Sequence, residues 1–183
     1  MSERTGDEER FASIYHAHRA AVAAYCRRRV LREVADDVTA DVFMTAWRRM
    51  DQIPSGSELP WLYGVARYVV ANHQRSSIRR SRLAARILSY GSHAVRDTSV
   101  TEAGWDGAVM DVLAGMSPSD QELLRLRAWE ELTSAEIGCV LGISVTAVDM
   151  RLSRARRRFE RALRAVGLVP ADAAARLAEE GSA

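Results

Sequence analysis

The densest group of chemically active side chains in this sequence is a run of arginines near its C-terminus. Between residues 151 and 164 the chain carries seven arginines and one acid, Glu160. Guanidinium groups at this density repel one another unless a polyanion neutralises them, and they pair well with phosphate. We therefore expect a nucleic-acid partner at this stretch. The simpler alternative is a solvated, basic surface helix.

Two helices joined by a tight turn are predicted to position these arginines. Thr133 and Glu136 have the spacing of a capping box, and Gly142 suits the left-handed residue that ends a helix. Apolar residues then recur at steps of three or four, which predicts a second helix over 145–166 with one buried stripe: Val148, Leu152, Ala155, Phe159, Leu163 and Val166. A basic helix entered from such a turn is typical of a helix-turn-helix docked in the major groove.

Only the first turns of this second helix can reach base edges, because a helix of this length leaves the groove. The predicted base-reading residues are Ser144, Thr146, Ala147, Asp149, Met150 and Arg151. The later arginines are predicted to contact phosphate, namely Arg154, Arg157 and Arg158.

The remaining composition indicates a globular chain without a catalytic centre. Apolar residues make up 48% of the 183 and charged residues 27%, as in a folded domain. The net charge of +2 is small, so the clustering of arginine at 27–32, 75–86 and 151–164 is more informative. No signal peptide or membrane-spanning run is recognisable, and we expect a cytoplasmic protein. We recognise no metal-ligand cluster or phosphate-binding glycine loop, so we expect no metal, cofactor or catalysis.

Three helices are predicted in the N-terminal half, after a polar segment at residues 1–9 that we expect to be frayed. Apolar periodicity begins at Arg10, recurs over 34–50 and returns from Pro60, after a loop at 51–60 that is rich in proline, glycine and serine. The helix over 34–50 has polar positions away from its buried stripe, which leaves a face for a protein partner: Asp41, Thr45, Arg48 and Arg49.

The third predicted helix becomes basic in its second half, and residues 73–96 contain no acid. A basic helix could bind a membrane surface, but apolar residues become sparse after Val70, which favours phosphate contact. Trp61, near its start, falls on the apolar stripe and is expected in the core. Cys26 and Cys139 fall in different predicted domains, so we expect no disulfide and two buried thiols.

Periodicity is lost from about residue 87 to 107, where glycine, serine and threonine increase. This pattern predicts a flexible linker. The predicted fold is therefore all-α, with two small helical bundle domains at 10–86 and 108–168 joined by the linker at 87–107.

Four stretches together resemble a known family. They are ADDVTADVFMTAWRRM at 35–50, PWLYGVARYVVANHQR at 60–75, LAGMSPSDQELLRLR at 113–127 and LTSAEIGCVLGISVTAVDMRLSRARRRF at 132–159. In this order and at this spacing they are similar to extracytoplasmic-function (ECF) sigma factors, the small two-domain class of the sigma-70 family of RNA polymerase sigma factors. The resemblance covers about 10–86 and 108–164, and it implies sigma region 2 followed by sigma region 4.

The resemblance also implies partners. The polar face at 34–50 corresponds to the part of region 2 that binds the β′ clamp helices of core RNA polymerase. The loop at 51–60 corresponds to the one that captures a flipped base of the minus-10 promoter element, with Ser55, Ser57 and Glu58 as candidates. The next helix is expected to meet minus-10 DNA through Asn72, Arg75 and Arg79. Region 4 is expected to recognise the minus-35 element and contact the β flap, and an anti-sigma factor is a further expected partner.

Some positions depart from the family pattern. Asp149 stands where a basic residue is frequent; an acid in the groove accepts from cytosine N4, so Asp149 is a candidate for base reading instead of phosphate contact. Met150 offers only apolar contact, for instance to a thymine methyl. Tyr68 stands where asparagine is frequent, and Gly64 where arginine is frequent. Two other functions stay open: a stand-alone helix-turn-helix transcriptional regulator, and a nucleic-acid-processing enzyme, which would need paired carboxylates that the chain does not offer in an obvious pattern.

Overall fold

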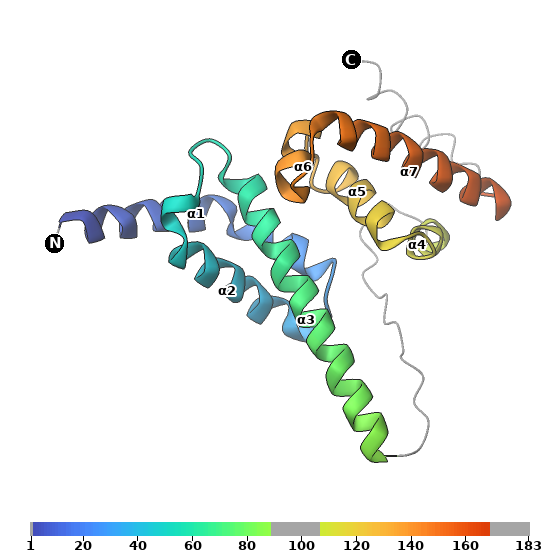
Figure 1. Ribbon diagram of the computed structural model, residues 1–183, viewed down its shortest axis with the longest axis horizontal. Helices are drawn as coiled ribbons and strands as arrows, with labels where there is room; N and C mark the ends of the chain where they lie inside the picture. Colours follow the sequence, from blue (N-terminus) through green and yellow to red (C-terminus); the bar gives the residue numbers. More distant parts are fainter. Residues whose placement is uncertain (1, 89–106, 169–183) are drawn as a thin grey trace. The chain divides into compact units, whose positions relative to one another are not determined.

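The computed structural model describes residues 2–88 and 107–168, and the chain divides into unit 1, Met1–Ser99, and unit 2, Val100–Ala183 (Figure 1). The described residues of unit 1 form α1 Ser2–Arg27, α2 Arg32–Arg48, the short 3-10 helix η1 Met50–Gln52, and α3 Glu58–Leu88. Those of unit 2 form α4 Gly107–Ala114, α5 Pro118–Ala128, α6 Ser134–Leu141 and α7 Val145–Ala165. The predicted all-α class with two helical bundles is confirmed, whereas most of the predicted linker lies outside the described residues.

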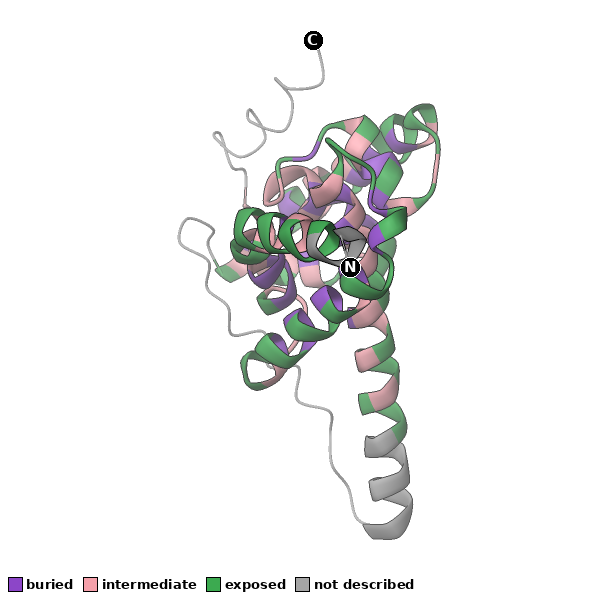
Figure 2. Ribbon diagram, turned by 90° about the vertical axis from the view of Figure 1, so that its left-hand side faces the viewer, coloured by how far each residue is buried: buried purple, intermediate pink, exposed green. Residues whose placement is uncertain are grey.

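Unit 1 is a three-helix bundle in which each helix packs against the other two. Figure 2 shows buried residues on the inner faces of these helices and exposed residues on their outer faces. The fully buried side chains come from all three helices and include Val22, Tyr25, Val38, Val42 and Leu62. These positions follow the predicted apolar stripes, because burial of apolar area is the main force that joins the helices.

Aromatic rings join α1 to its neighbours at two places. Near the start of α1, Phe11 packs edge-on against Trp47 and Phe43 of α2, with ring centroids 5.1 and 6.4 Å apart. Near its end, Tyr25 stacks on Tyr63 of α3 at 5.1 Å. These contacts fix α1 along its length and hold α2 and α3 in register with it.

Several boundaries in unit 1 differ from the sequence expectation. The segment expected to be frayed is helical from Ser2 onward, although no apolar residue marks this part of the helix. The third helix begins at Glu58, two residues before Pro60, and η1 occupies part of the predicted loop. Trp47, predicted on the buried stripe of α2, is 44% exposed, since α1 covers only one side of its ring.

Unit 2 is built around α7, which packs against α4, α5 and α6. Its predicted stripe is buried from Val148 through Leu163, and this part of the prediction is confirmed. Val166 is an exception at 59% exposed, because α7 ends at Ala165 and Gly167 follows with a φ of 74°. Within residues 2–88 and 107–168, no helix is long and apolar enough to cross a bilayer.

Candidate nucleic-acid interface

The turn that leads into α7 is held by local caps. The Thr133 hydroxyl accepts a hydrogen bond from the Glu136 N–H at 3.3 Å, and the Thr133 N–H donates to the Glu136 carboxylate at 2.8 Å. Gly142 ends α6 in the left-handed conformation, with a φ of 67°. The predicted capping box and glycine cap are therefore confirmed, and they set where α6 stops and the turn begins.

Gly138, inside α6, allows the turn that follows α6 to pack closely against the helix. This role was not predicted from the sequence. A Cβ atom at this position would lie 2.8 Å from the backbone oxygen of Ile143, closer than real Cβ atoms come. The Gly138 carbonyl also accepts from the Ile143 N–H at 3.1 Å. The turn thus folds directly over Gly138. A glycine inside an otherwise apolar short helix is the sequence signal that could have indicated this close approach.

The first turns of α7 present most of the predicted base-reading residues to solvent. Ser144 caps the helix, and its hydroxyl accepts from the Ala147 N–H at 3.3 Å. Ala147 is half-buried, so it offers less to a ligand than its neighbours do. The exposed members of the predicted group are Ser144, Thr146, Asp149, Met150 and Arg151.

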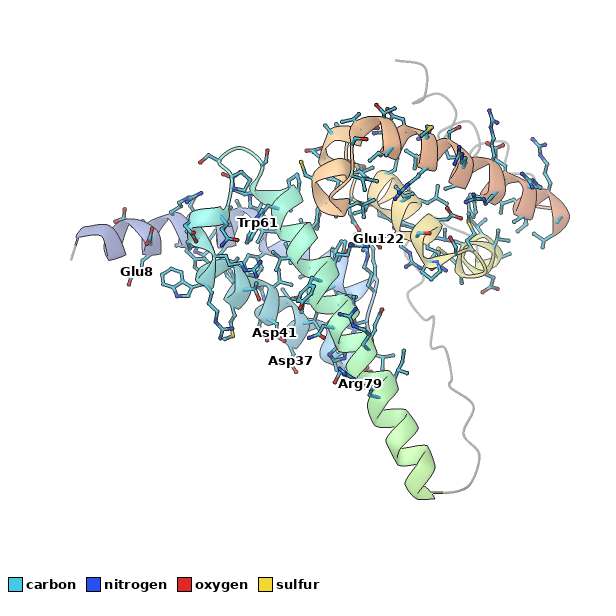
Figure 3. The ribbon with its side chains drawn as sticks, viewed as in Figure 1. Glu8, Asp37, Asp41, Trp61, Arg79 and Glu122 are labelled. Carbon is cyan, nitrogen blue, oxygen red and sulfur yellow. The ribbon has the colours of Figure 1, made fainter. Side chains whose placement is uncertain are left out.

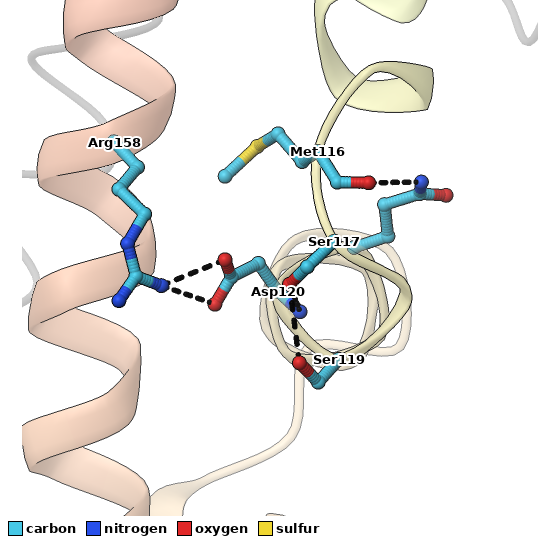
Figure 4. Close-up of polar contacts among 6 residues, drawn as sticks. Met116, Ser117, Ser119, Asp120 and Arg158 are labelled. Atoms are coloured by element: carbon cyan, nitrogen blue, oxygen red, sulfur yellow. Dashed lines mark hydrogen bonds and ion pairs between the residues drawn. The ribbon is translucent and has the colours of Figure 1, made fainter.

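The later arginines of α7 separate into two kinds. Arg154 and Arg157 are exposed, as a phosphate contact requires. Arg158 instead has a partner inside unit 2: its Nη1 donates to both carboxylate oxygens of Asp120, at 2.8 and 2.7 Å (Figure 4). The sequence did not predict this contact, because the two residues are 38 positions apart.

Asp120 is placed for this role by the start of α5. The residue is only 7% exposed, and its N–H donates to the Ser117 hydroxyl, which caps the helix. A buried carboxylate needs a charged partner or several hydrogen bonds, and Arg158 supplies the partner. The side chain of Arg158 is still 53% exposed, so the pair lies at the surface of unit 2 rather than in its core. The pair therefore ties the middle of α7 to α5.

In unit 1 the loop before α3 is held from two sides. Arg10 of α1 donates through Nη1 to the Met50 carbonyl at 3.1 Å and through Nη2 to the Ile53 carbonyl at 2.6 Å. Within the loop, the Glu58 carboxylate accepts from the N–H of Gly56, which has a φ of 78°. The sequence pattern does not predict the role of Arg10 in this loop, because Arg10 lies 40 residues or more from its acceptors.

Hydrogen bonds also change the acidity of Glu58. Its own N–H and that of Gly56 stabilise the ionised carboxylate, and they hold the pKa of Glu58 below its ordinary value of 4.5. Glu58 is therefore occupied in ordering the loop, whereas the two other loop candidates, Ser55 and Ser57, are exposed.

The exposed side of α3 carries the remaining minus-10 candidates. Asn72, Arg75 and Arg79 are all exposed and follow one another at steps of three and four, which puts them on one face. Figure 3 labels Arg79 on this helix beyond the bundle and Trp61 near its start. Trp61 is half-buried rather than part of the core, so the expectation of core packing holds only in part.

The polar face predicted on α2 is also solvent-facing. Asp41, Arg48 and Arg49 are exposed, and Asp41 projects from α2 in Figure 3 beside Asp37, one turn earlier. Thr45 is half-buried, and its hydroxyl donates to the Asp41 carbonyl at 2.8 Å. Met44, on the neighbouring side of the helix, is 51% exposed and adds an apolar element to this face.

The two cysteines differ in environment. Cys26 is buried, as predicted, but Cys139 is exposed on α6, and that part of the prediction is wrong. The buried side of α6 is provided by Ile137, Gly138 and Val140, which leaves position 139 on the outside of this short helix.

Comparisons with known families match both units. The family described as sigma-70 region 2 matches residues 14–80, and that described as sigma-70, region 4 matches residues 106–159. Among curated proteins, the ECF RNA polymerase sigma factor BldN of Streptomyces coelicolor is 28% identical over 87% of this chain and 62% of its own length. The RNA polymerase sigma factor NccH of Alcaligenes xylosoxydans xylosoxydans is 27% identical over 84% of this chain and 87% of its own length.

Solved structures agree on the fold. The sigma factor RpoE of Bartonella quintana, in complex with the anti-sigma factor NepR, aligns with a TM-score of 0.62 at 21% identity, over 85% of this chain and 98% of that one. CnrH, in complex with the cytosolic domain of CnrY, aligns with a TM-score of 0.59 at 22% identity, over 88% and 92%. Region 2 and region 4 match in that order on two separate helical units, and the chain therefore belongs to the sigma-70 family, as an RNA polymerase sigma factor of the ECF class.

Proposed function

We propose that the two units divide promoter recognition between them, and that the chain itself performs no catalysis. Unit 2 binds the minus-35 element with the first turns of α7, and unit 1 binds minus-10 DNA with the loop before α3 and the exposed face of α3. The polar face of α2 binds the β′ clamp helices of core polymerase, and unit 2 contacts the β flap. This function requires the compartment that holds DNA and polymerase, which is the cytoplasm.

The minus-35 assignment rests on one observation. Side chains in the first turns of α7, directly after the tight turn that follows α6, are exposed to solvent. Thr146, Asp149 and Arg151 are exposed there, while the next turns place Arg154 and Arg157 outward as cations. Side chains at the start of such a helix are the ones that contact base edges, and later basic residues contact phosphate. Base recognition by Asp149 and Arg151 follows from this arrangement.

An anti-sigma factor is the partner that we propose for control. The solved structures of RpoE and CnrH hold an anti-sigma factor, NepR, and the cytosolic domain of CnrY, respectively. We extend this kind of partner to the present chain because it shares their fold and their class.

The test is transcription by core polymerase reconstituted with the purified chain on a promoter library, followed by sequencing of transcript starts. We expect a common minus-35 and minus-10 pair among the active promoters. Asp149→Ala and Arg151→Ala should change the preferred minus-35 sequence, with about 1–3 kcal/mol at stake for a good base contact. Arg157→Ala is the matched control, and it should lower activity evenly across the library.

Two outcomes contradict the proposal. Binding of the chain alone to a palindromic site, without copurification with core polymerase, indicates a stand-alone regulator. Even scaling of activity by Asp149→Ala and Arg151→Ala places base recognition elsewhere in unit 2.

A further inference from the structure

The second half of α3 extends beyond the three-helix bundle of unit 1. The buried side chains of α3 lie in its first half and end with Val70. From residue 71 to residue 79 every side chain is half-buried or exposed. Figure 1 shows this part of α3 reaching past α1 and α2. Apolar packing therefore fixes α3 only as far as Val70, and any restraint on the next turns must come from other contacts.

One hydrogen bond restrains α3 a single turn after Val70. Gln74 Nε2 donates to the backbone carbonyl of Arg29 at 2.9 Å, across 45 positions of the sequence. Arg29 lies in the corner between α1 and α2, which we define as residues 28–31. The bond is exposed to water, so its contribution depends on how firmly its acceptor is held in place.

The acceptor carbonyl is held by the side chain of the same residue. The Arg29 guanidinium lies over the ring of Tyr25, 3.5 Å from its centroid, and Nη1 donates to the Tyr25 carbonyl at 3.1 Å. The Arg29 N–H also donates to the Cys26 carbonyl at 2.9 Å. Tyr25 is fully buried and stacks on Tyr63 of α3. A cation over a buried ring is held more strongly than one over an exposed ring, so Arg29 anchors the corner to the core of unit 1.

Tyr63 and Gln74 attach the same face of α3 to the end of α1. They are 11 residues apart, which is about 16 Å along the axis and returns to within about 20° of the same direction. Tyr63 contacts Tyr25, and Gln74 contacts Arg29, four residues later. Two attachments at this separation define the direction of the helix axis. The contact with Tyr63 alone would leave the turns after Val70 free to bend.

We propose that Arg29 and Gln74 are positioning residues, which affect promoter opening through the direction of α3 and not by touching DNA. The inference rests on the function proposed above and adds two residues that lie outside the DNA-facing positions. Arg75 and Arg79 are exposed and follow Gln74 by one and five positions, so a bend at residue 74 moves both relative to the loop before α3. Functional side chains must be held in place by supporting contacts, and the Gln74–Arg29 contact gives that support.

The first measurement follows the direction of α3 in the free chain. Asp37→Cys and Ser77→Cys place spin labels on exposed positions of α2 and α3, in a Cys139→Ser background, while Cys26 is buried and stays unlabelled. Gln74→Met keeps most of the side-chain length but removes the donor. The distribution of distances between the labels should therefore broaden or shift in this variant.

The second measurement uses the complete chain with core polymerase on a promoter mapped by transcript sequencing. Permanganate reactivity of unpaired thymines measures promoter opening. Gln74→Met should lower opening roughly 2- to 10-fold, the loss expected for one hydrogen bond. Binding to core polymerase and to minus-35 DNA should stay at the wild-type level, because those surfaces are proposed on α2 and in unit 2.

Further variants distinguish one shared contact from two separate effects. Arg29→Met should lower opening at least as much as Gln74→Met, and the double variant should lose no more than Arg29→Met alone, whereas separate roles multiply the two losses. Arg29→Lys keeps a cation near the Tyr25 ring and should recover part of the opening. Arg32→Met removes an exposed arginine beside the corner, and it should match the wild type in both measurements.

The possible results are distinct. An unchanged distance distribution in Gln74→Met, or a changed distribution with wild-type opening, overturns the positioning role while the promoter function stands. Multiplied losses in the double variant do the same. Absence of promoter-dependent transcription by wild-type holoenzyme overturns the proposed function and this inference with it. If circular dichroism shows that Arg29→Met does not fold, Gln74→Met decides alone, since Gln74 is exposed.

Discussion

The two units hold their DNA-facing segments in different ways. In unit 2, the turn before α7 is fixed by residues that are neighbours in the sequence, such as the Thr133–Glu136 capping box. In unit 1, the loop before α3 is held by Arg10, which comes from α1 and reaches the carbonyls of Met50 and Ile53. The first arrangement depends mainly on residues close in sequence, whereas the second requires α1 to pack beside the loop.

This difference implies different sensitivities. A locally capped turn should keep its conformation when residues elsewhere in its bundle are changed. It should lose that conformation when the packing of its own backbone is disturbed. A loop held by a side chain from a distant helix should lose its conformation when that side chain is replaced, even though the loop sequence is intact. Four substitutions test this contrast, and their expected effects decrease from Gly138→Val to Glu58→Gln.

Gly138→Val should have the largest effect, because a side chain at this position collides with the backbone of the turn at Ile143. We expect unit 2 to lose roughly 3 kcal/mol of stability, as in an overpacked core. The measurement is thermal or urea unfolding followed by helical circular dichroism. Gly107→Ala is the control, since a Cβ atom there meets nothing within 4 Å. A stable Gly138→Val variant that still binds DNA disproves the tight packing of the turn.

Arg10→Met should be next, because it removes two hydrogen bonds from a charged donor while keeping most of the side-chain volume. We expect a loss of about 2 kcal/mol in the stability of unit 1. Promoter opening should also fall, while minus-35 binding by unit 2 is unchanged. Arg10→Lys tests the geometry, since it keeps the charge but replaces the two donor nitrogens of the planar guanidinium by one ammonium nitrogen. If both variants behave like the wild type, the loop does not depend on α1.

Asp120→Asn should have a smaller effect, about 1 kcal/mol, because the Arg158 side chain is half-exposed and water replaces part of the lost attraction. Arg158→Ala should destabilise unit 2 similarly and leave the salt dependence of DNA binding unchanged. Arg157→Ala should do the reverse, with stability retained and the salt slope reduced by roughly one unit. An equal drop in salt slope for both arginines contradicts a purely internal role for Arg158.

Glu58→Gln should have the smallest effect, and it should depend on pH. The folded pKa of Glu58 is lowered, so its stabilisation of the loop is complete above the ordinary value of 4.5 and is lost as pH falls through the lower folded pKa. Hydrogen exchange of the Gly56 amide measures this, since that N–H donates to Glu58. Protection should decline on acidification in the wild type and lack this step in Glu58→Gln.

The sequence was most informative where structure is local. The periodicity of α7 and the caps at Thr133 and Gly142 are found as predicted, because each depends on residues within one or two helical turns. Long-range contacts were not predictable in this way. The Asp120–Arg158 pair and the Arg10 tether join residues 38 or more positions apart, and periodicity carries no information on such pairs.

The predictions that were wrong concern segments where the apolar repeat is missing and residues where it does not determine burial. The first turns of α1 contain no apolar repeat, so a helix that begins at Ser2 was expected to be frayed. Trp47 and Cys139 have apolar character but lie at the edges of their helices' buried sides, where burial depends on how far a neighbouring helix extends. Residue type alone does not determine that extent.

The position of Asp120 has a consequence for how unit 2 opens. The residue belongs to the first turn of α5, whose cap is Ser117, and its carboxylate is also the partner of Arg158 on α7. Unwinding that turn moves the carboxylate away from α7, and lifting α7 leaves a negative charge without its partner. Local openings of the two segments are therefore linked, and amides at the start of α5 and in the middle of α7 should exchange with solvent as one cooperative unit.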